Sequence, residues 1–457
     1  MKLPLWRIAE FVGSKGECDQ EAVAMGYSID SRTLNPGDLF IAITGERFDG
    51  HEYVQAALEK GAVGAIVEAG KQVGGDPLRL LKVENTLKAL QLLGAAARRL
   101  WGKPLLAVTG SAGKTTTKEI LAHILATRFR VMKSSGNLNN HIGLPLQLLK
   151  LEAEHDFGVV EMGMNHAGEN RALGELAHHD LAVVTAVAPV HLEFFGSLAE
   201  IARAKYEIIE TLPSGGVAVL NADDEYVSQF GRDFKGKVVT FGIKRTADVT
   251  AQEIKLNGAE GSTFELVVGS IGEPVTFPLV GEHNIYNALA AAAAAMDRGI
   301  SPSQAAAALS SISPPDKRGQ VLHLHGATII NDCYNSNPRA LEAMIDTLAS
   351  MKAERRILVV GEMLELGPTA ETLHRECGTH AAEKKIDVVI GVRGMARAVA
   401  EAACGSGTQA QFVETPELAG EWLARNLRPG DAVLLKASRG VKLERALDML
   451  QDKVPAR

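Results

Sequence analysis

The residues with the clearest chemistry lie just after residue 104. Residues 105–116 read LLAVTGSAGKTT, which is an apolar run, then a glycine-rich turn, then a Gly-Lys-Thr string. Glycines let several backbone N–H groups curl around one anion, and a helix that follows adds its positive N-terminal end. Lys114 would reach the terminal phosphates of a nucleotide, and the Thr115 hydroxyl would face Mg²⁺. The pattern therefore predicts a nucleoside triphosphate site.

The predicted phosphate cradle has seven consecutive members: Gly110, Ser111, Ala112, Gly113, Lys114, Thr115 and Thr116. Val108 stands where the longer G-x-x-x-x-G-K-[ST] form has its first glycine, so the match to that form is incomplete. The alternative is an ordinary glycine-rich turn that binds nothing. An expected strand, the Gly-Lys-Thr string and an expected helix in the right order favour the nucleotide site.

The elements that must position this cradle alternate between apolar runs and helical stretches. The expected strands are residues 105–108, 157–160, 181–187 and 217–220, and the expected helices include residues 114–126 and 199–211. Continuous apolar strands that alternate with helices are typical of a parallel sheet covered on both faces. Between residues 237 and 278 the pattern changes to alternating strands and turns, which predicts an antiparallel annex.

Two further blocks flank this central one. Residues 1–84 contain short apolar strands and one expected helix over residues 51–60, and after Ser313-Pro314-Pro315 the strand–helix alternation restarts. The predicted fold is α/β with three domains. They are a small α/β domain at 1–84, a central parallel-sheet domain of the P-loop ATPase type at 85–314, and a Rossmann-like domain at 315–457.

Composition narrows the class of protein. The chain has 457 residues, of which 46% are hydrophobic and 23% charged, a balance that argues against a disordered or fibrous chain. Its formal net charge of −7 provides no electrostatic reason to expect nucleic acid or an anionic membrane as a partner. No apolar run approaches the roughly 20 residues that span a bilayer. The four scattered cysteines indicate a reducing compartment, so we expect a cytoplasmic protein without membrane insertion.

Several further strings resemble the Mur ligase family of ATP-dependent amide-bond enzymes, over essentially the whole chain. The family's phosphate loop is the shortened T-G-[ST]-x-G-K-[TS], which residues 109–115 match. Residues 281–287, GEHNIYN, resemble its G-x-H-N-x-x-N motif. Three more strings are similar to the branch that adds D-alanyl-D-alanine: DCYNSNP at 332–338, GEMLELG at 361–367 and KASR at 436–439.

The resemblance implies ATP, two Mg²⁺ ions and four metal ligands: Thr115, Glu161, His191 and Lys205. Glu161 ends an expected strand, where open α/β sheets place ligands, although a solvent-facing carboxylate is the alternative. His191 matches the family's second-metal histidine, and an ordinary structural histidine is the alternative. Lys205 lies in a string like the family's A-K-x-E-[IL], whose lysine is carbamylated. That reaction requires a lowered lysine pKa, because only the neutral amine reacts with CO₂.

The resemblance also implies which residues contact the nucleotide. Asn284 would face adenine, because its amide has both a donor and an acceptor, and a helix N-cap is the alternative. Arg318 would contact the ATP phosphates, although many members read Gly-Arg where this chain has Arg318 before Gly319. Asp332 would face the ribose.

The substrate residues implied by the resemblance come from all three blocks. Ser31 and Arg32 lie in a string similar to the UDP-sugar domain of the family, and Asn140 lies in its asparagine-rich loop. Tyr334 and Asn335 would line the reaction centre, so the catalytic candidates are Lys114, Lys205 and Asn335. Residues 49–51, Asp-Gly-His, belong to the same first-block resemblance, and a turn with a helix cap is an equal alternative.

The activity implied is the joining of D-alanyl-D-alanine to UDP-MurNAc-tripeptide by a monomeric enzyme through an acyl phosphate. Since the reactants are anionic, such catalysis needs clamping by cations more than a nucleophilic side chain. Two alternatives stay open. One is the Mur ligase that adds the third amino acid, which shares the first block. The other is a non-catalytic, nucleotide-gated binding protein, which would need neither Glu161 nor Lys205.

Overall fold

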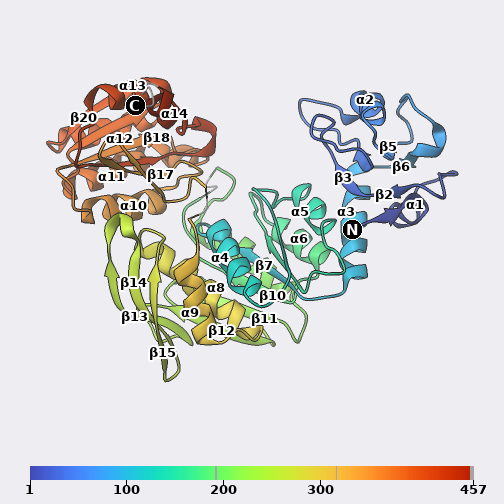
Figure 1. The fold of residues 1–457 in the computed structure, drawn as a ribbon, viewed down its shortest axis with the longest axis horizontal. Coiled ribbons are helices and arrows are strands. Elements are labelled where there is room, and N and C mark those ends of the chain that lie inside the picture. Colours follow the sequence, from blue (N-terminus) through green and yellow to red (C-terminus); the bar gives the residue numbers. More distant parts are fainter. Residues whose placement is uncertain (191–192, 315, 453–457) are drawn as a thin grey trace.

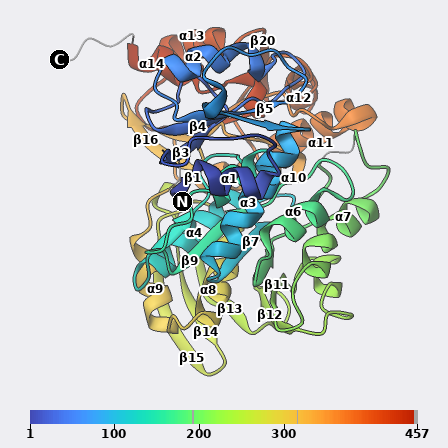
Figure 2. The same ribbon diagram turned by 90° about the vertical axis from the view of Figure 1, so that its right-hand side faces the viewer.

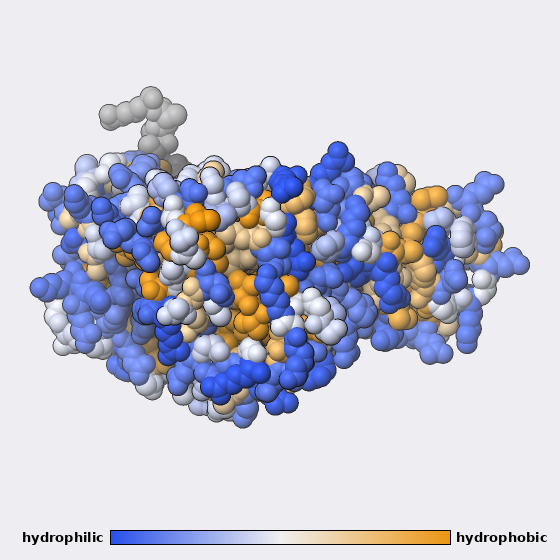
Figure 3. All heavy atoms as spheres, turned by 90° about the horizontal axis from the view of Figure 1, so that it is seen from below, coloured by the Kyte–Doolittle hydropathy of each residue, from blue (hydrophilic) through white to orange (hydrophobic). Residues whose placement is uncertain are grey.

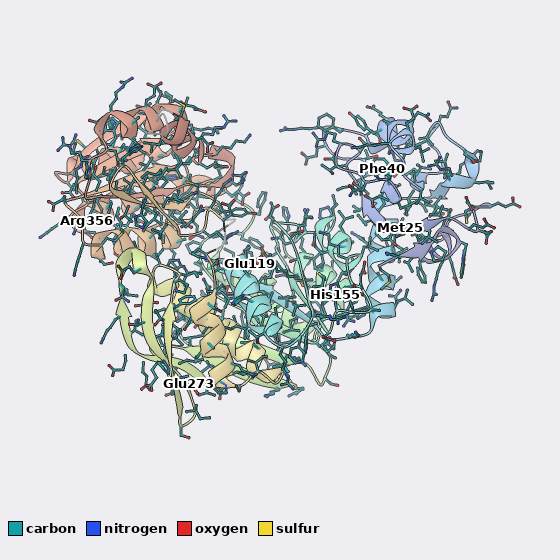
Figure 4. The ribbon with its side chains drawn as sticks, in the orientation of Figure 1. Met25, Phe40, Glu119, His155, Glu273 and Arg356 are labelled. Carbon is teal, nitrogen blue, oxygen red and sulfur yellow. The ribbon has the colours of Figure 1, made fainter. Side chains whose placement is uncertain are left out.

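The computed structural model describes residues 1–190, 193–314 and 316–452. Three α/β domains follow one another along an arc, with the N-terminal and C-terminal domains at opposite ends of the central one (Figure 1). Figure 4 marks the same order with Phe40 in the first domain, Glu119 in the second and Arg356 in the third. This arrangement confirms the predicted three-domain α/β fold.

The N-terminal domain is built on a four-stranded parallel sheet in the order β3-β4-β5-β6. Its strands are β3 (Gly26–Ser28), β4 (Asp38–Ile41), β5 (Gly64–Glu68) and β6 (Leu80–Val83), and β1 (Leu3–Pro4) pairs separately with β2 (Val23–Ala24). Helix α2 (Val54–Glu59) covers one face, and α1 (Leu5–Val12) and α3 (Thr86–Trp101) cover the other. A short 3₁₀ helix, η2 (Pro77–Arg79), precedes β6.

The single helix expected over residues 51–60 was wrong. The chain forms a 3₁₀ helix, η1 (Gly50–Tyr53), and then the shorter α2, because Tyr53 leaves helical geometry between them. The η1 turn is held by Asp49, whose carboxylate accepts a hydrogen bond from the backbone N–H of His51. Helix α3 begins after Asn85, whose side chain caps it. It lies beside α1 and α6 (Figure 2) and also packs against α5 of the central domain.

The central domain contains a nine-stranded sheet in the order β15-β14-β13-β12-β11-β10-β7-β9-β8. Its strands are β7 (Leu105–Thr109), β8 (Val131–Lys133), β9 (Phe157–Glu161), β10 (Leu181–Val184), β11 (Val217–Asn221), β12 (Lys237–Gly242), β13 (Val249–Leu256), β14 (Ser262–Val268) and β15 (Ile271–Phe277). One face packs on α4 (Lys114–Ala126), α8 (Glu282–Asp297) and α9 (Pro302–Ser311). The other face packs on α5 (Gly143–Leu148), α6 (Glu169–Ala177) and α7 (Leu198–Glu210). Two 3₁₀ turns, η3 (Val227–Gln229) and η4 (Gly258–Glu260), complete the domain.

The antiparallel annex expected from residue 237 was only partly right. Strand β12 pairs in parallel with β11, β13 pairs in parallel with β12, and only β13, β14 and β15 pair antiparallel. The first four residues of β12, 237–240, are exposed or half-buried, so this parallel strand lacks the continuous burial of its neighbour β11. A succession of short strands and turns does not by itself decide whether neighbouring strands pair in parallel or antiparallel, so the direction of β12 was not predicted. The strand expected over residues 181–187 ends at Val184.

The C-terminal domain has a six-stranded sheet in the order β16-β17-β21-β18-β19-β20, parallel except for the β16–β17 pair. Its strands are β16 (Gln320–Leu324), β17 (Ala327–Asp332), β18 (Arg355–Gly361), β19 (Val388–Val392), β20 (Gln409–Val413) and β21 (Asp431–Lys436). Helices α10 (Pro338–Ser350), α11 (Ala370–Glu383) and α12 (Ala396–Gly405) cover one face, and α13 (Pro416–Asn426) and α14 (Arg445–Asp452) cover the other. The 3₁₀ turns η5 (Gly367–Thr369) and η6 (Arg439–Val441) lie in its loops.

The surface in Figure 3 is mainly hydrophilic, with apolar side chains gathered in patches between the charged ones. None of the helices in the described part of the chain combines the length and apolar character that crossing a membrane requires. All four cysteines are free, and three of them, Cys18, Cys333 and Cys377, are buried.

Candidate active site

A cleft of about 510 Å³ lies between the central and C-terminal domains. Thirteen of the residues singled out from the sequence line it: Ser111, Ala112, Gly113, Lys114, Thr115, Thr116, Asn140, Glu161, Asn284, Arg318, Asp332, Tyr334 and Asn335. These residues are spread over more than 220 positions of the chain, so the tertiary fold brings together what sequence motifs only suggested. The candidate His191 lies outside the described residues.

The phosphate cradle is a tight turn between β7 and α4. Gly113 occupies the N-cap position of α4 with φ of 81°, a left-handed conformation that favours glycine. A Cβ atom on Gly113 would lie 2.2 Å from Oδ1 of Asn287, so the site has no room for a side chain. Gly110 lies behind the cleft lining, where a Cβ atom would lie 1.9 Å from the Thr185 hydroxyl. Strand, glycines and helix therefore follow one another as the sequence predicted, an arrangement that suits an anion.

Lys114 lies at the first turn of α4 and bends back over the cradle. Its ammonium donates a 2.7 Å hydrogen bond to the carbonyl oxygen of Gly110. Burial lowers the pKa of Lys114; Glu161 opposes that shift, and the nearby Arg318 guanidinium reinforces it. A cation placed in this way is suited to the phosphate oxygens of a nucleotide.

Glu161 ends β9 with its carboxylate turned into the cleft and only 3% exposed. Its Oε2 accepts a 2.6 Å hydrogen bond from the Thr115 hydroxyl, and its Oε1 accepts one of 2.8 Å from Nδ2 of Asn139. Its backbone N–H donates to the Ser134 hydroxyl at 3.1 Å. The alternative of a carboxylate turned to solvent was therefore wrong. Sequence reasoning named Asn140 in this loop and missed Asn139, although the run of asparagines was the signal.

Asn140 lines the cleft and also stabilises the loop before α5. Its Oδ1 accepts hydrogen bonds from the backbone N–H groups of Ile142 at 3.2 Å and Gly143 at 2.8 Å, where α5 begins. Through these bonds Asn140 fixes the loop that carries Asn139 against Glu161.

Lys205 lies on α7, with 2% of its surface exposed. Burial first, and then the Lys114 ammonium, hold the pKa of Lys205 well below its usual range. No carboxylate in the described ranges forms an ion pair with it. Helix α7 is itself fixed to α6, because the Glu207 carboxylate accepts from the backbone N–H of Gly168 at 2.8 Å. A lowered pKa favours the neutral amine of Lys205, which is the form that reacts with CO₂.

Arg318 reaches from the C-terminal domain into the cradle. Its Nη2 donates a 3.0 Å hydrogen bond to the Thr115 hydroxyl, and its guanidinium stacks 4.0 Å from the ring centre of Tyr334. Arg318 precedes Gly319, whereas many family members have the glycine first. The Arg318 guanidinium nevertheless lies at the phosphate loop, as the resemblance implied. Thr115 receives a hydrogen bond from Arg318 and donates one to Glu161, and so joins both domains.

Asp332 ends β17 and pairs with a lysine that sequence reasoning did not select. Its Oδ2 accepts from Nζ of Lys436, and its Oδ1 accepts from the backbone N–H of Gly319 at 3.1 Å. The same Lys436 ammonium donates to the carbonyl oxygen of Asn335 at 3.1 Å. The signal for Lys436 was its place in the KASR string. Together these bonds fix the loop that presents Tyr334 and Asn335 to the cleft.

Asn284 lies in the first turn of α8, but the N-cap of that helix is Gly281. The Asn284 amide donates to the carbonyl oxygen of Val280 at 2.8 Å and accepts from Nδ2 of Asn287 at 2.9 Å. The N-cap alternative for Asn284 was therefore wrong. Beside it, burial lowers the pKa of His283 to about 4, so its imidazole is neutral at physiological pH.

The candidates of the first domain lie apart from this cleft. The Arg32 guanidinium forms two hydrogen bonds to Asp30, at 2.9 and 2.7 Å, with its side chain 86% exposed, and Ser31 lies in the same turn. His51 donates from Nδ1 to Asp49 at 2.6 Å, because its Nε2 accepts the backbone N–H of Glu68 at 3.0 Å. Residues 49–51 therefore form a turn with a helix cap, as the alternative interpretation of this string predicted.

The donor set of the cleft suits a hard cation. In the described part of the chain no three His, Cys, Asp or Glu side chains form a group that could hold a metal ion by themselves. The Thr115 hydroxyl and the Glu161 carboxylate nevertheless converge at the edge of the cradle, and Mg²⁺ is usually held by one or two carboxylates together with phosphate oxygens and water. The residues present therefore fit Mg²⁺ bound together with a nucleotide.

Comparison with known proteins assigns the chain to a family. Three family models match: "Mur ligase family, catalytic domain" over residues 24–132, "Mur ligase middle domain" over 108–295, and "Mur ligase, glutamate ligase domain" over 317–439. The chain belongs to the Mur ligase family. The expectation drawn from the sequence motifs is confirmed.

Relatives of this Mur ligase match it over almost their whole length. UDP-N-acetylmuramoyl-tripeptide--D-alanyl-D-alanine ligase of Bacillus subtilis is 36% identical, with 93% of each chain covered. The crystal structure of MurF from Acinetobacter baumannii superposes with a TM-score of 0.90 at 30% identity, covering 99% of each chain. MurF ligase from Thermotoga maritima, solved in complex with ADP, has a TM-score of 0.83 at 29% identity and covers 94% of this chain and 98% of its own.

Proposed function

We propose that this Mur ligase uses ATP to join D-alanyl-D-alanine to UDP-MurNAc-tripeptide, giving UDP-MurNAc-pentapeptide for peptidoglycan synthesis. One observation carries the proposal: the Lys114 cradle and the Tyr334–Asn335 loop of the dipeptide-adding motif line the same cleft, with Arg318 joining them. The full-length likeness to relatives named for this reaction supports it.

In the proposed reaction the terminal carboxylate of the tripeptide attacks the γ-phosphorus of ATP, and ADP leaves. The acyl phosphate that results has a good leaving group, which a free carboxylate lacks at neutral pH. The amine of D-alanyl-D-alanine then attacks the carbonyl carbon, phosphate departs, and the nitrogen loses a proton as the amide forms. Lys114 and Arg318 would hold the phosphate charge, while Asn335 would orient the reacting groups.

Two Mg²⁺ ions would be held by Thr115, Glu161, His191 and carbamylated Lys205. When bound, they would neutralise phosphate charge and orient the triphosphate. Carbamylation would give Lys205 an anionic oxygen, and the burial of its amine, which lowers its pKa, supports that modification. Asn139 would keep the Glu161 carboxylate turned toward the ion.

Each domain would hold a different part of the reactants. Ser31 and Arg32 of the N-terminal domain, residues 1–84, would bind the UDP end, with Asn140 contacting the substrate nearer the cleft. Asn284 and Asp332 would hold adenosine, and the C-terminal domain, from residue 315, would bind the dipeptide at Tyr334 and Asn335. We place the enzyme, as a monomer, in the cytoplasm, where its four free thiols would stay reduced.

Incubation of the protein with ATP, Mg²⁺, UDP-MurNAc-tripeptide and D-alanyl-D-alanine tests the proposal. We expect ADP release that requires the dipeptide, and a product whose mass equals tripeptide plus dipeptide less one water. ADP release that requires a single diamino acid instead would assign the protein to the third-residue step. Nucleotide binding without ligation of either acceptor would favour a nucleotide-gated binding protein.

A further inference from the structure

One acidic side chain behind the cleft contacts cations from two separate segments of the C-terminal domain. Glu444 lies immediately before α14 with its side chain 15% exposed, and its Oε1 accepts from Nζ of Lys317 at 3.2 Å. The same oxygen accepts from Nη1 of Arg439 in the KASR loop. Arg439 lines the active-site cleft, whereas Glu444 lines a second, smaller cavity on the other side of these loops.

Lys317 immediately precedes the arginine that enters the phosphate cradle. The backbone around Arg318 is unusual, since Lys317 has φ of 55° and Gly319 has φ of 67°. The left-handed region is unfavourable for a residue with a side chain, so this turn needs support from outside. Two contacts on opposite sides of the turn supply it: Lys317 bonds back to Glu444, and Arg318 bonds forward to Thr115.

The contacts on either side of this turn leave its conformation little freedom. The carbonyl oxygen of Lys317 accepts a hydrogen bond from the backbone N–H of Tyr334 at 3.2 Å, and the Tyr334 ring stacks on Arg318. The other acidic neighbour of Lys317, Asp316, is 4.0 Å away and 77% exposed, which makes it a weak competitor. Glu444 is therefore the anionic anchor that turns the Lys317 side chain away from the cleft.

We propose that Glu444 is a positioning residue for ATP: by holding Lys317 and Arg439 it fixes the direction in which Arg318 enters the phosphate cradle. This inference depends on the proposed function in one respect only, namely the reaction that the Arg318 guanidinium serves. Glu444 itself touches neither the cleft nor the reactants. Its contribution is made through the two cations, so it is distinct from the metal ligands and from the cradle.

The test compares Glu444→Gln with Lys317→Met, which breaks the same ion pair from its other end. A misdirected guanidinium should lower kcat by about tenfold to hundredfold in each variant and weaken binding of a non-hydrolysable ATP analogue, with KM for D-alanyl-D-alanine unchanged. The double variant should lose no more than Glu444→Gln alone, because that change already breaks the ion pair with Lys317. In an Arg318→Ala background, Glu444→Gln should have no further effect.

Glu417→Gln is the matched control, since Glu417 forms an exposed ion pair with Arg445 in the same domain at 3.3 Å. That variant should keep wild-type turnover and analogue affinity. Unchanged analogue affinity and kcat in Glu444→Gln would overturn the proposal, as would additive losses in the double variant with Lys317→Met. The analogue titration needs no acceptor. Protein that fails to ligate the dipeptide but loses analogue affinity in Glu444→Gln would thus disprove the proposed function and uphold this inference.

Discussion

The hydroxyl group of Thr115 lies 2.6 Å from Oε2 of Glu161, although the two residues are 46 positions apart in the chain. Thr115 belongs to the phosphate cradle and lies in the first turn of α4, and Glu161 ends β9, the strand beside β7 in the sheet. Parallel strands deliver their carboxyl ends to one edge, so the contact follows from the register of β7 and β9. The Thr115–Glu161 pair is the centre of a hydrogen-bond network. Glu161 also accepts from Asn139 of the asparagine-rich loop, and Thr115 of the phosphate cradle also accepts from Arg318.

Replacing Thr115 tests this centre directly. Thr115→Ala removes the hydroxyl that joins Glu161 to Arg318, and we expect kcat to fall by about a hundredfold, the usual size for losing one group at a phosphoryl-transfer site. Thr115→Ser keeps the hydroxyl and should stay close to wild type. Steady-state ADP release at saturating ATP measures both. Equal activities of the alanine and serine variants would show that the hydroxyl has no part in the reaction.

Asn139 is the amide partner of the Glu161 carboxylate, and changing it to aspartate should alter the pH dependence of turnover. A second carboxylate at hydrogen-bond distance repels the first, so it is unfavourable for both to be ionised at once. The fully ionised pair is then lost at a higher pH, so, if an ionised carboxylate is required as proposed, the acid limb of the pH–activity profile should move to higher pH. Asn139→Ala adds no charge and should lower activity while leaving that limb in place, so equal shifts in both variants would contradict the prediction.

Lys205→Ala should abolish ligation, and short carboxylic acids should restore part of it if the carbamate is an oxygen ligand. The physical reason is that a small acid replaces the missing carboxylate in the buried pocket. Lys118→Ala is the control, because Lys118 is equally buried but donates to the carbonyl oxygen of Ser134 at 2.6 Å, a bond that an acid cannot replace. Rescue of both variants, or of neither, would count against carbamylation.

The buried imidazole of His179 should lower the free energy of unfolding at acid pH. Burial lowers the pKa of His179 from 6.5 to about 4, with its Nε2 donating to the carbonyl oxygen of Ile208 at 2.9 Å. Its stabilising effect is complete above pH 6.5 and is lost as the pH falls toward 4, because only the unfolded chain takes up the proton in that window. The expected loss is about 3 kcal/mol.

Urea unfolding between pH 4.5 and 7 measures this effect. His179→Gln keeps a donor for Ile208 and should flatten the dependence of the free energy of unfolding on pH. His166→Gln is the control, since the His166 side chain is 57% exposed. An unchanged slope in the His179 variant would mean that other groups cause the acid sensitivity.

The sequence by itself determined the local parts of this protein. A strand, two glycines in special conformations and Gly-Lys-Thr specify the strand–turn–helix of the cradle, because these elements follow one another directly in the chain. The α/β class and the three blocks followed from alternating apolar runs and helices for the same reason. The sequence strings that resemble the Mur ligase family added four separate candidate site residues: Glu161, Lys205, Arg318 and Asp332.

Only the tertiary structure decided how these parts meet. Asn139 and Lys436 became site residues through bonds to Glu161 and Asp332, partners 22 and 104 positions away. The direction of β12 and the approach of Arg318 to Thr115 depend on which elements pack together across the chain. Residue patterns report burial along one element, whereas contacts between elements arise from sheet register and domain packing, which no local pattern encodes.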